Sequence, residues 1–294
     1  MKKKILVTGA NGQVGQELKR LSASYPGFEF LFTTRETLSF EITETIISYF
    51  KANQIDLCIN CAAYTAVDKA ETEKETAFQV NGEAVGVLAT ECHKRNIPLI
   101  HISTDYVFDG TATSPIREDD AVKPVNTYGA SKLKGEELAL KNNPLTVIVR
   151  TSWVYSQFGN NFVKTMVRLM KEREQLSVVA DQFGGPTYAA DLAEALLKIA
   201  SLLCESGAVP ESFAGRYHYA NTGKISWFEF ADAIRELSGS NCTVHPIATE
   251  QFPTPAKRPA YSVMDTQKIQ NTFQIEIPFW KDSLQRCLQL LLQQ

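Results

Sequence analysis

The first half of the chain alternates short apolar runs with amphipathic stretches. Five runs that are apolar on both faces predict strands, at 4–8, 28–32, 56–60, 98–103 and 145–150. Helical periodicity lies between them, around 13–24, 43–53, 76–95 and 127–141. Strands without a polar face, separated by helices, predict a doubly wound parallel α/β sheet that helices cover on both sides.

After residue 151 the pattern is less regular. It predicts helices at 159–172, 189–203 and 279–292, and strands at 176–179 and 216–220. A further helix should begin at Ser226, whose hydroxyl can cap it together with Glu229 three positions later. The proline-rich stretch 245–259 predicts a loop.

These elements predict two lobes. The first is built from 1–150 plus about 189–220, because the helix and strand of the later segment return to it. The second, a smaller α/β lobe, is built from 151–188 plus 221–294.

Charge and hydropathy exclude several classes of protein. The 30 basic residues stand against 33 acidic ones, without a basic face or tail, so we expect no nucleic-acid or membrane-surface partner. No stretch approaches a membrane span, and the apolar run after the first lysines is too short for a signal peptide. Six scattered cysteines suit reduced thiols, so we expect a cytoplasmic protein. Cys58 and Cys61 form a C-x-x-C within a strand pattern, and we interpret both as core residues.

Three glycines follow the first strand and open the first helix. Gly9, Gly12 and Gly15 allow a tight turn, a close approach of the backbone to a diphosphate, and close packing of the helix on the strand. The helix N-terminus also attracts an anion. The alternative interpretation of the three glycines is a simple tight turn. The strand before the glycines and the helix after them favour a dinucleotide-binding Rossmann lobe over 1–150 plus about 189–220.

The end of the second strand helps to choose the cofactor. A carboxylate there would favour NAD, but the sequence places Arg35 after two threonines, and a basic side chain tolerates a 2′-phosphate. We therefore expect NADPH, with NADH as the alternative if Arg35 is only a solvated loop residue.

Hydroxyl groups and an amine converge after the fourth strand. Thr104 and Asp105 follow that strand, where ligands of doubly wound sheets bind. Tyr128 and Lys132 are four residues apart at the start of the next helix, so they share one face. An ammonium near a phenol lowers its pKa. A surface tyrosine over a lysine stem is the commoner meaning of such a pair alone, but here it accompanies a glycine loop and a hydroxyl-rich turn.

This combination resembles the extended short-chain dehydrogenase/reductase family over essentially the whole chain. The most discriminating segments are "STDYVFDG" (103–110) and "DQFGGPTY" (181–188), which look like the family's sugar-nucleotide reductases. Dehydratases and epimerases of the family usually carry an acid where Tyr106 stands. The resemblance implies reduction of the C4 ketone of a dTDP-linked 4-keto-6-deoxy sugar by NAD(P)H. The alternatives are a non-catalytic binding relative, or an epimerase or dehydratase acting on another sugar nucleotide.

By that resemblance Tyr128 is the proton donor and Thr104 binds the carbonyl oxygen. Lys132 lowers the pKa of the tyrosine and holds the nicotinamide ribose. The resemblance also assigns cofactor contacts to Gly9, Gly12, Gln13, Val14, Gly15, Arg35, Ser39, Phe40, Ala62, Ala63 and Tyr64, although an Asp is more usual at position 39.

The substrate site implied by the resemblance is made of Asp105, Tyr106, Trp153 and Arg258, in addition to Thr104. Trp153 is equally well interpreted as a core residue, and Arg258 as a partner in a surface salt bridge.

The resemblance bears on metal binding too. Some members of the family are dimers bridged by magnesium, but Gly15 and Ala190 stand where two of the acids would be, which leaves Asp191. We therefore expect no metal, and the sequence leaves a homodimer open. The four histidines have no ligand spacing.

Overall fold

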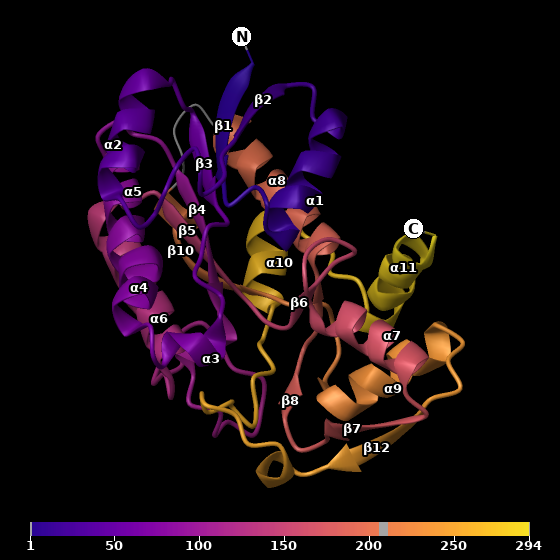
Figure 1. The fold of residues 1–294 in the computed structure, drawn as a ribbon. Helices are drawn as coiled ribbons and strands as arrows, with labels where there is room; N and C mark the ends of the chain where they lie inside the picture. The colour runs from indigo at the N-terminus through magenta and orange to yellow at the C-terminus, as the bar shows by residue number, and fades with distance from the viewer. Residues whose placement is uncertain (1, 206–210, 294) are drawn as a thin grey trace.

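A six-stranded parallel sheet organises the larger part of the molecule, in a computed structural model that describes residues 2–205 and 211–293 (Figure 1). The strands run in the order β10-β5-β4-β3-β1-β2. Their bounds are Lys3–Thr8 (β1), Phe28–Phe32 (β2), Leu57–Asn60 (β3), Leu99–Thr104 (β4), Thr146–Thr151 (β5) and Gly215–Tyr219 (β10). The prediction of a doubly wound parallel α/β sheet is confirmed.

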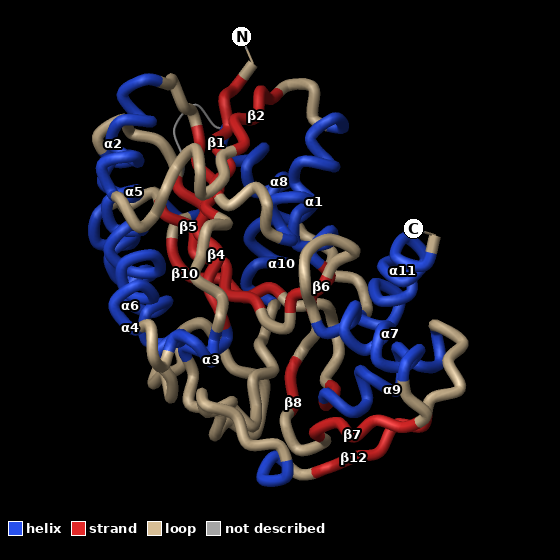
Figure 2. The backbone as a smooth tube through the Cα atoms, in the orientation of Figure 1, coloured by secondary structure: helices blue, strands red, loops and turns tan. Residues whose placement is uncertain are grey.

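Helices cover both faces of this sheet, as Figure 2 shows in blue on either side of the red strands. One face carries α1 (Gln13–Leu21), α8 (Ala189–Glu205) and α10 (Gln267–Phe273). The other carries α2 (Thr43–Ala52), α5 (Ala84–His93) and α6 (Thr127–Asn142). Strand β1 explains the division, because Ile5 and Val7 pack toward the first set and Leu6 toward the second.

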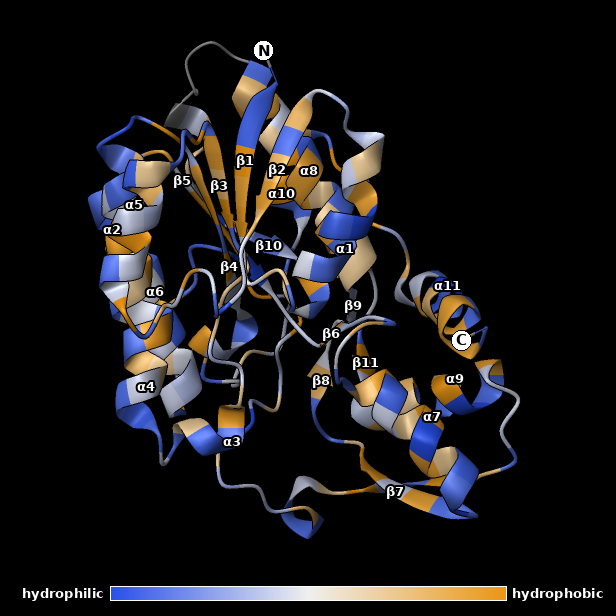
Figure 3. Ribbon diagram, turned by 45° about the horizontal axis from the view of Figure 1, so that its top comes forward, coloured by the Kyte–Doolittle hydropathy of each residue, from blue (hydrophilic) through white to orange (hydrophobic). Residues whose placement is uncertain are grey.

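The second lobe is smaller and has its own apolar core. Its helices are α7 (Phe162–Glu172), α9 (Trp227–Leu237) and α11 (Trp280–Leu292), and their apolar residues form one buried cluster. Strand β7 (Gln175–Val179) pairs in parallel with β12 (Thr243–Ile247) beneath them. Coloured by hydropathy in Figure 3, these helices alternate orange and blue around their axes, as amphipathic helices do.

Shorter elements complete the chain. They are α3 (Val67–Ala70), α4 (Lys74–Phe78), β6 (Val154–Tyr155), β8 (Phe183–Gly184), β9 (Thr187–Tyr188), β11 (Ile225–Ser226), a π-helical turn at Gln79–Glu83, and 3₁₀ turns at Ser22–Ser24, Asp105–Val107, Glu211–Phe213 and Thr249–Gln251. No helix in the described part of the chain is long and apolar enough to cross a membrane.

Two expectations about secondary structure are wrong. The predicted loop 245–259 begins inside β12, which tolerates Pro246 because this strand pairs on one side only. The predicted helix 76–95 is interrupted by the π turn, where the Asn81 side chain binds both backbone groups of Tyr64. The predicted cap of α9 is confirmed, since Ser226 and Glu229 form a full capping box.

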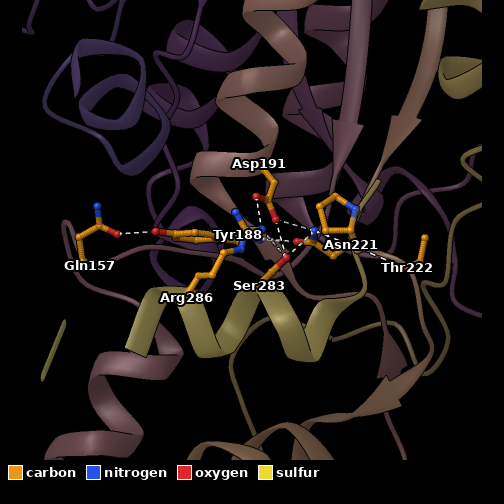
Figure 4. Close-up of polar contacts among 8 residues, drawn as sticks. Gln157, Tyr188, Asp191, Asn221, Thr222, Ser283 and Arg286 are labelled. Atoms are coloured by element: carbon orange, nitrogen blue, oxygen red, sulfur yellow. Dashed lines mark hydrogen bonds and ion pairs between the residues drawn. The ribbon is translucent and has the colours of Figure 1, made fainter. Parts of the chain in front are cut away.

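A buried carboxylate connects the two parts of the molecule. Asp191 on α8 accepts hydrogen bonds from Asn221 (2.8 Å) and Ser283 (2.5 Å) and pairs with Arg286 (2.6 Å). Figure 4 shows these groups converging, with Ser283 and Arg286 projecting from α11. Asp191 therefore attaches the last helix, α11, to the sheet lobe. The division of the chain into two domains stays a prediction.

Candidate active site

The carboxyl ends of β1, β3, β4 and β5 open into one large cleft of about 1020 Å³. Every predicted site residue except Arg258 lines it: Gly9, Gly12, Gln13, Val14, Gly15, Arg35, Ser39, Phe40, Ala62, Ala63, Tyr64, Thr104, Asp105, Tyr106, Tyr128, Lys132 and Trp153. The structure thus brings together residues that are up to 144 positions apart in sequence, from Gly9 to Trp153.

The glycine loop leaves its backbone open toward the cleft. Gly9 has φ of +66°, and a Cβ atom there would lie 2.6 Å from the backbone nitrogen of Ala62. A Cβ atom on Gly15 would lie 2.5 Å from the carbonyl oxygen of Gly9. At the start of α1, Gly12 offers no side chain to cap the first N–H groups. These free donors, at the positive end of a helix dipole, fit a diphosphate.

Arg35 lies at the rim of the cleft. Its side chain is 74% exposed and forms an ion pair with Glu41, which lines the cleft as well. An exposed guanidinium beside the adenosine end of a dinucleotide site fits a 2′-phosphate, provided that it exchanges the Glu41 carboxylate for that group.

A cap and a close contact fix the start of α6. The Asn126 side chain accepts a hydrogen bond from the Gly129 nitrogen (2.8 Å) and donates one to the Lys257 carbonyl (2.8 Å). A Cβ atom on Gly129 would lie 2.1 Å from the Tyr106 carbonyl oxygen, so only glycine lets α6 approach the turn after β4 this closely. Tyr128 is thereby held against that turn, with its ring edge-to-face on Tyr106 at 5.5 Å.

The pKa of Tyr128 departs from the expectation. Burial raises the pKa of Tyr128 to about 12, and the Thr104 hydroxyl, which lowers it, offsets only part of that effect. Lys132 does not contribute to the shift, because its amine is directed elsewhere. The structure therefore contradicts the prediction that Lys132 lowers the pKa of this tyrosine.

Lys132 is turned into the sheet. Its Nζ donates to the Ile102 carbonyl at 2.7 Å and lies 3.5 Å from Nε2 of His101. Burial lowers the pKa of Lys132 to about 8, against an opposing influence of Glu136. The amine therefore titrates much closer to neutrality than an exposed lysine.

The turn after β4 presents a hydroxyl and a carboxyl group. Thr104 Oγ1 donates to Asp105 Oδ1 at 3.0 Å and accepts from the Tyr106 nitrogen at 3.2 Å. Asp105 is 2% exposed, and within the described structure its Oδ2 has no hydrogen-bond partner. Burial raises the pKa of this carboxyl to about 6. An unpaired buried oxygen at the cleft wall suits a ligand hydroxyl.

An aromatic stack forms the wall that faces the second lobe. Trp153, just after β5, has φ of +47° and stacks on Trp227 of α9, with ring centroids 3.6 Å apart. Gly184 leaves room for it, since a Cβ atom there would lie 2.6 Å from the indole. Trp227 was not predicted as a cleft residue, because its place depends on how α9 packs against the turn after β5.

Arg258 and Cys61 differ from the expectations made for them. Arg258 does not line the cleft; it pairs with Asp68 at 2.8 Å, which is the salt-bridge alternative. Cys58 is buried in the core, whereas Cys61 is only partly buried and lines the cleft. The expectation that both cysteines are core residues is therefore wrong for Cys61, which follows the last residue of β3.

Comparison with known proteins agrees with this geometry. The family model described as "RmlD substrate binding domain" matches residues 2–293. The chain belongs to this family. A dTDP-4-dehydrorhamnose reductase from Sinorhizobium fredii is 40% identical to this RmlD-family chain over 293 residues, with 98% of each chain covered.

Two solved structures named as the same reductase are similar throughout. The one from Clostridium acetobutylicum has a TM-score of 0.91 at 39% identity, covering 98% of this chain and 99% of its own. The one from Bacillus anthracis, in complex with NADP, has a TM-score of 0.90 at 37% identity, covering 99% of this chain and 100% of its own. The resemblance and the fold predicted for this RmlD-family chain are confirmed.

Metal binding was the remaining question about the described residues of the cleft. Among the described residues, no group of three or more His, Cys, Asp or Glu side chains could hold a metal ion. Asp191, the one acid left at the family's bridging positions, is occupied by Arg286, Ser283 and Asn221.

Proposed function

We propose that the protein reduces the C4 ketone of dTDP-4-dehydro-L-rhamnose to dTDP-L-rhamnose with NADPH. The observation that carries the proposal is the meeting of Thr104, Tyr128 and Lys132 in one cleft with an open glycine loop. The relatives named as this reductase, and the related structure that holds NADP, support the same reaction and cofactor.

The cofactor, when bound, supplies a hydride to the ketone carbon. The glycine loop from Gly9 to Gly15 would hold its diphosphate, and Arg35 would hold its 2′-phosphate. Lys132 would hold the nicotinamide ribose after its amine leaves the Ile102 carbonyl. The aromatic stack of Trp153 and Trp227 lines one side of the cleft.

Tyr128 donates the proton that completes the reduction. A general acid must hold its proton until negative charge develops on the ketone oxygen, and a pKa of about 12 keeps Tyr128 protonated throughout the neutral range. The Thr104 hydroxyl, close enough to lower that pKa, orients the same oxygen. Asp105, with one oxygen unpaired, accepts a hydrogen bond from a sugar hydroxyl.

The decisive experiment supplies dTDP-4-keto-6-deoxyglucose, a 3,5-epimerase and NADPH, and follows NADPH absorbance and sugar product together. We expect one NADPH consumed for each reduced sugar. Tyr128→Phe should lower turnover by about two or more powers of ten while NADPH still binds. Conversion of the sugar without net NADPH oxidation would point to an epimerase, and binding without turnover to a non-catalytic relative.

Assembly and location stay predictions. Sedimentation equilibrium measures whether the protein is a homodimer, and fractionation measures whether it is cytoplasmic.

A further inference from the structure

A chain of buried polar groups runs through the sheet behind the cleft, from β1 to Lys132. Thr8 donates to Asn60 Oδ1 at 2.6 Å, Asn60 Nδ2 lies 2.8 Å from His101 Nδ1, and His101 Nε2 lies 3.5 Å from Lys132 Nζ. All four side chains are at most 5% exposed. Burying polar groups in the middle of a parallel sheet costs free energy unless each donor meets an acceptor. The direction of the hydrogen bonds along this chain is therefore constrained.

The backbone fixes the direction of this chain. The Ala62 nitrogen donates to Asn60 Oδ1 at 3.1 Å, and a backbone N–H can only donate, so the oxygen of the Asn60 amide must face Ala62. Asn60 Nδ2 is then a donor toward His101 Nδ1. Nδ1 must accept, and in a neutral imidazole the single proton is on Nε2. That N–H points at the lysine amine.

A second buried histidine in the same sheet has the opposite arrangement. His218 on β10 lies with Nδ1 3.1 Å from the Ile116 carbonyl, which can only accept, so its proton is on Nδ1. Its Nε2 faces Arg150 at 3.5 Å as an acceptor. The two histidines are therefore a matched pair: one presents a lone pair to its cation and the other presents an N–H.

We propose that His101 is a positioning residue for Lys132, and that its Nε2–H, held toward the amine by Asn60, favours the neutral amine over the ammonium. A neutral Nζ can accept this N–H while donating to the Ile102 carbonyl; an ammonium would face the positive end of the imidazole dipole. The proposal concerns the same site as the proposed reduction and rests on it for its catalytic meaning.

The other groups around Lys132 do not favour its neutral amine. Glu136, one turn further along α6, is engaged by Arg150 through two bonds of 2.9 and 2.7 Å, so its negative charge is compensated. Cys61, after β3, is a neutral thiol because burial raises its pKa to about 12. Tyr128, one turn earlier, is neutral as well. Glu136 favours the ammonium, so the influences left to favour the neutral amine are burial and the His101 ring.

For the proposed reduction, the consequence is an amine that can accept a hydrogen bond as well as donate one when it leaves the Ile102 carbonyl. After Tyr128 has given its proton to the ketone oxygen, the phenolate regains a proton from solvent, because a neutral amine has no acidic proton to give.

The first test reads the tautomer in the unchanged protein, by ¹⁵N NMR of the histidine rings. We expect His101 to carry its proton on Nε2 and His218 to carry its proton on Nδ1. A proton on Nδ1 of His101 would overturn the proposal, whatever the protein's activity proves to be.

The second test follows Lys132 directly, by the pH dependence of its ¹³Cε resonance, assigned with Lys132→Met. His101→Asn keeps an acceptor for Asn60 and removes the donor toward Lys132. We expect the titration midpoint of Lys132 to rise by about one pH unit or more, and His101→Gln, which can restore an N–H there, to reverse part of the rise. His218→Asn is the control for a buried change in the same sheet. The positioning role of His101 would be refuted by an unchanged Lys132 midpoint in His101→Asn. It would also be refuted by equal changes of that midpoint in His101→Asn and His218→Asn. No substrate is needed, so the outcome is independent of whether the proposed reduction is correct.

Discussion

At the residue scale, Asp105 combines deep burial with an unpaired oxygen. Its folded pKa of about 6 lies above the ordinary value of 3.8, so the folded state binds the proton more tightly than the unfolded state. The resulting stabilisation is complete below about pH 4 and is lost as the pH rises through 6. At pH 7.5 the ionised carboxylate destabilises the fold.

Asp105→Asn should therefore stabilise the protein at pH 7.5 and have little effect near pH 4. A gain of about 3 kcal/mol in the free energy of unfolding is expected from a shift of this size. Urea unfolding of both proteins from pH 4 to 8 measures it. A difference that does not change with pH would mean that Asp105 is not the titrating group.

Arg35 gives the second prediction at this scale. Arg35→Ala should weaken NADPH binding about tenfold or more, because a charge-assisted bond to phosphate is lost, and should leave NADH nearly unaffected. Titration of cofactor fluorescence measures both dissociation constants. Glu41→Gln, which releases Arg35 from its ion pair, is the control and should not weaken NADPH. Equal losses for the two cofactors would remove Arg35 from the 2′-phosphate site.

At the scale of elements, α6 carries Tyr128, the proposed proton donor, and Asn126 sets where the helix begins. Asn126→Ala removes the cap on Gly129 and the bond to Lys257. We expect a loss of about 1–2 kcal/mol in stability and, because Tyr128 is two residues away, a fall in turnover larger than the change in NADPH affinity. Ser226→Ala, at the cap of α9, is the matched control for stability. Equal falls in turnover for both caps would contradict a specific effect on Tyr128.

Elements were predictable where their signal is local. The five strands predicted in the first half of the chain lie within one residue of those observed, because a strand buried on both faces is a short apolar run with clear ends. The π turn in 76–95 was not predictable, since it depends on Asn81 meeting the Tyr64 backbone 17 residues away. The cleft-facing position of Trp227 likewise depends on how α9 packs against the turn after β5. The motifs predicted which residues meet in the cleft, but they did not predict the pKa of Tyr128, because burial rather than neighbouring charge decides it.

At the scale of the whole molecule, Asp191 holds α11 on α8. Asp191→Ala would leave the buried Asn221 amide and Ser283 hydroxyl without this acceptor, while the half-exposed Arg286 could turn to water. We expect the free energy of unfolding to fall by about 2–4 kcal/mol. Urea denaturation measures it. Asp232→Ala, which breaks an exposed pair with Arg235, is the control and should cost less than about 1 kcal/mol. Similar losses in the two variants would mean that the contacts of Asp191 contribute no more to stability than a surface ion pair.

The indole stack makes the cleft visible to spectroscopy. The chain has three tryptophans, and two of them, one just after β5 and one at the start of α9, lie face to face in the wall of the cleft. A ligand that enters beside this wall changes the surroundings of both rings, whereas Trp280 stays packed in the apolar core of the smaller lobe. Intrinsic fluorescence is thus a label-free gauge of ligand entry that the natural chain already carries.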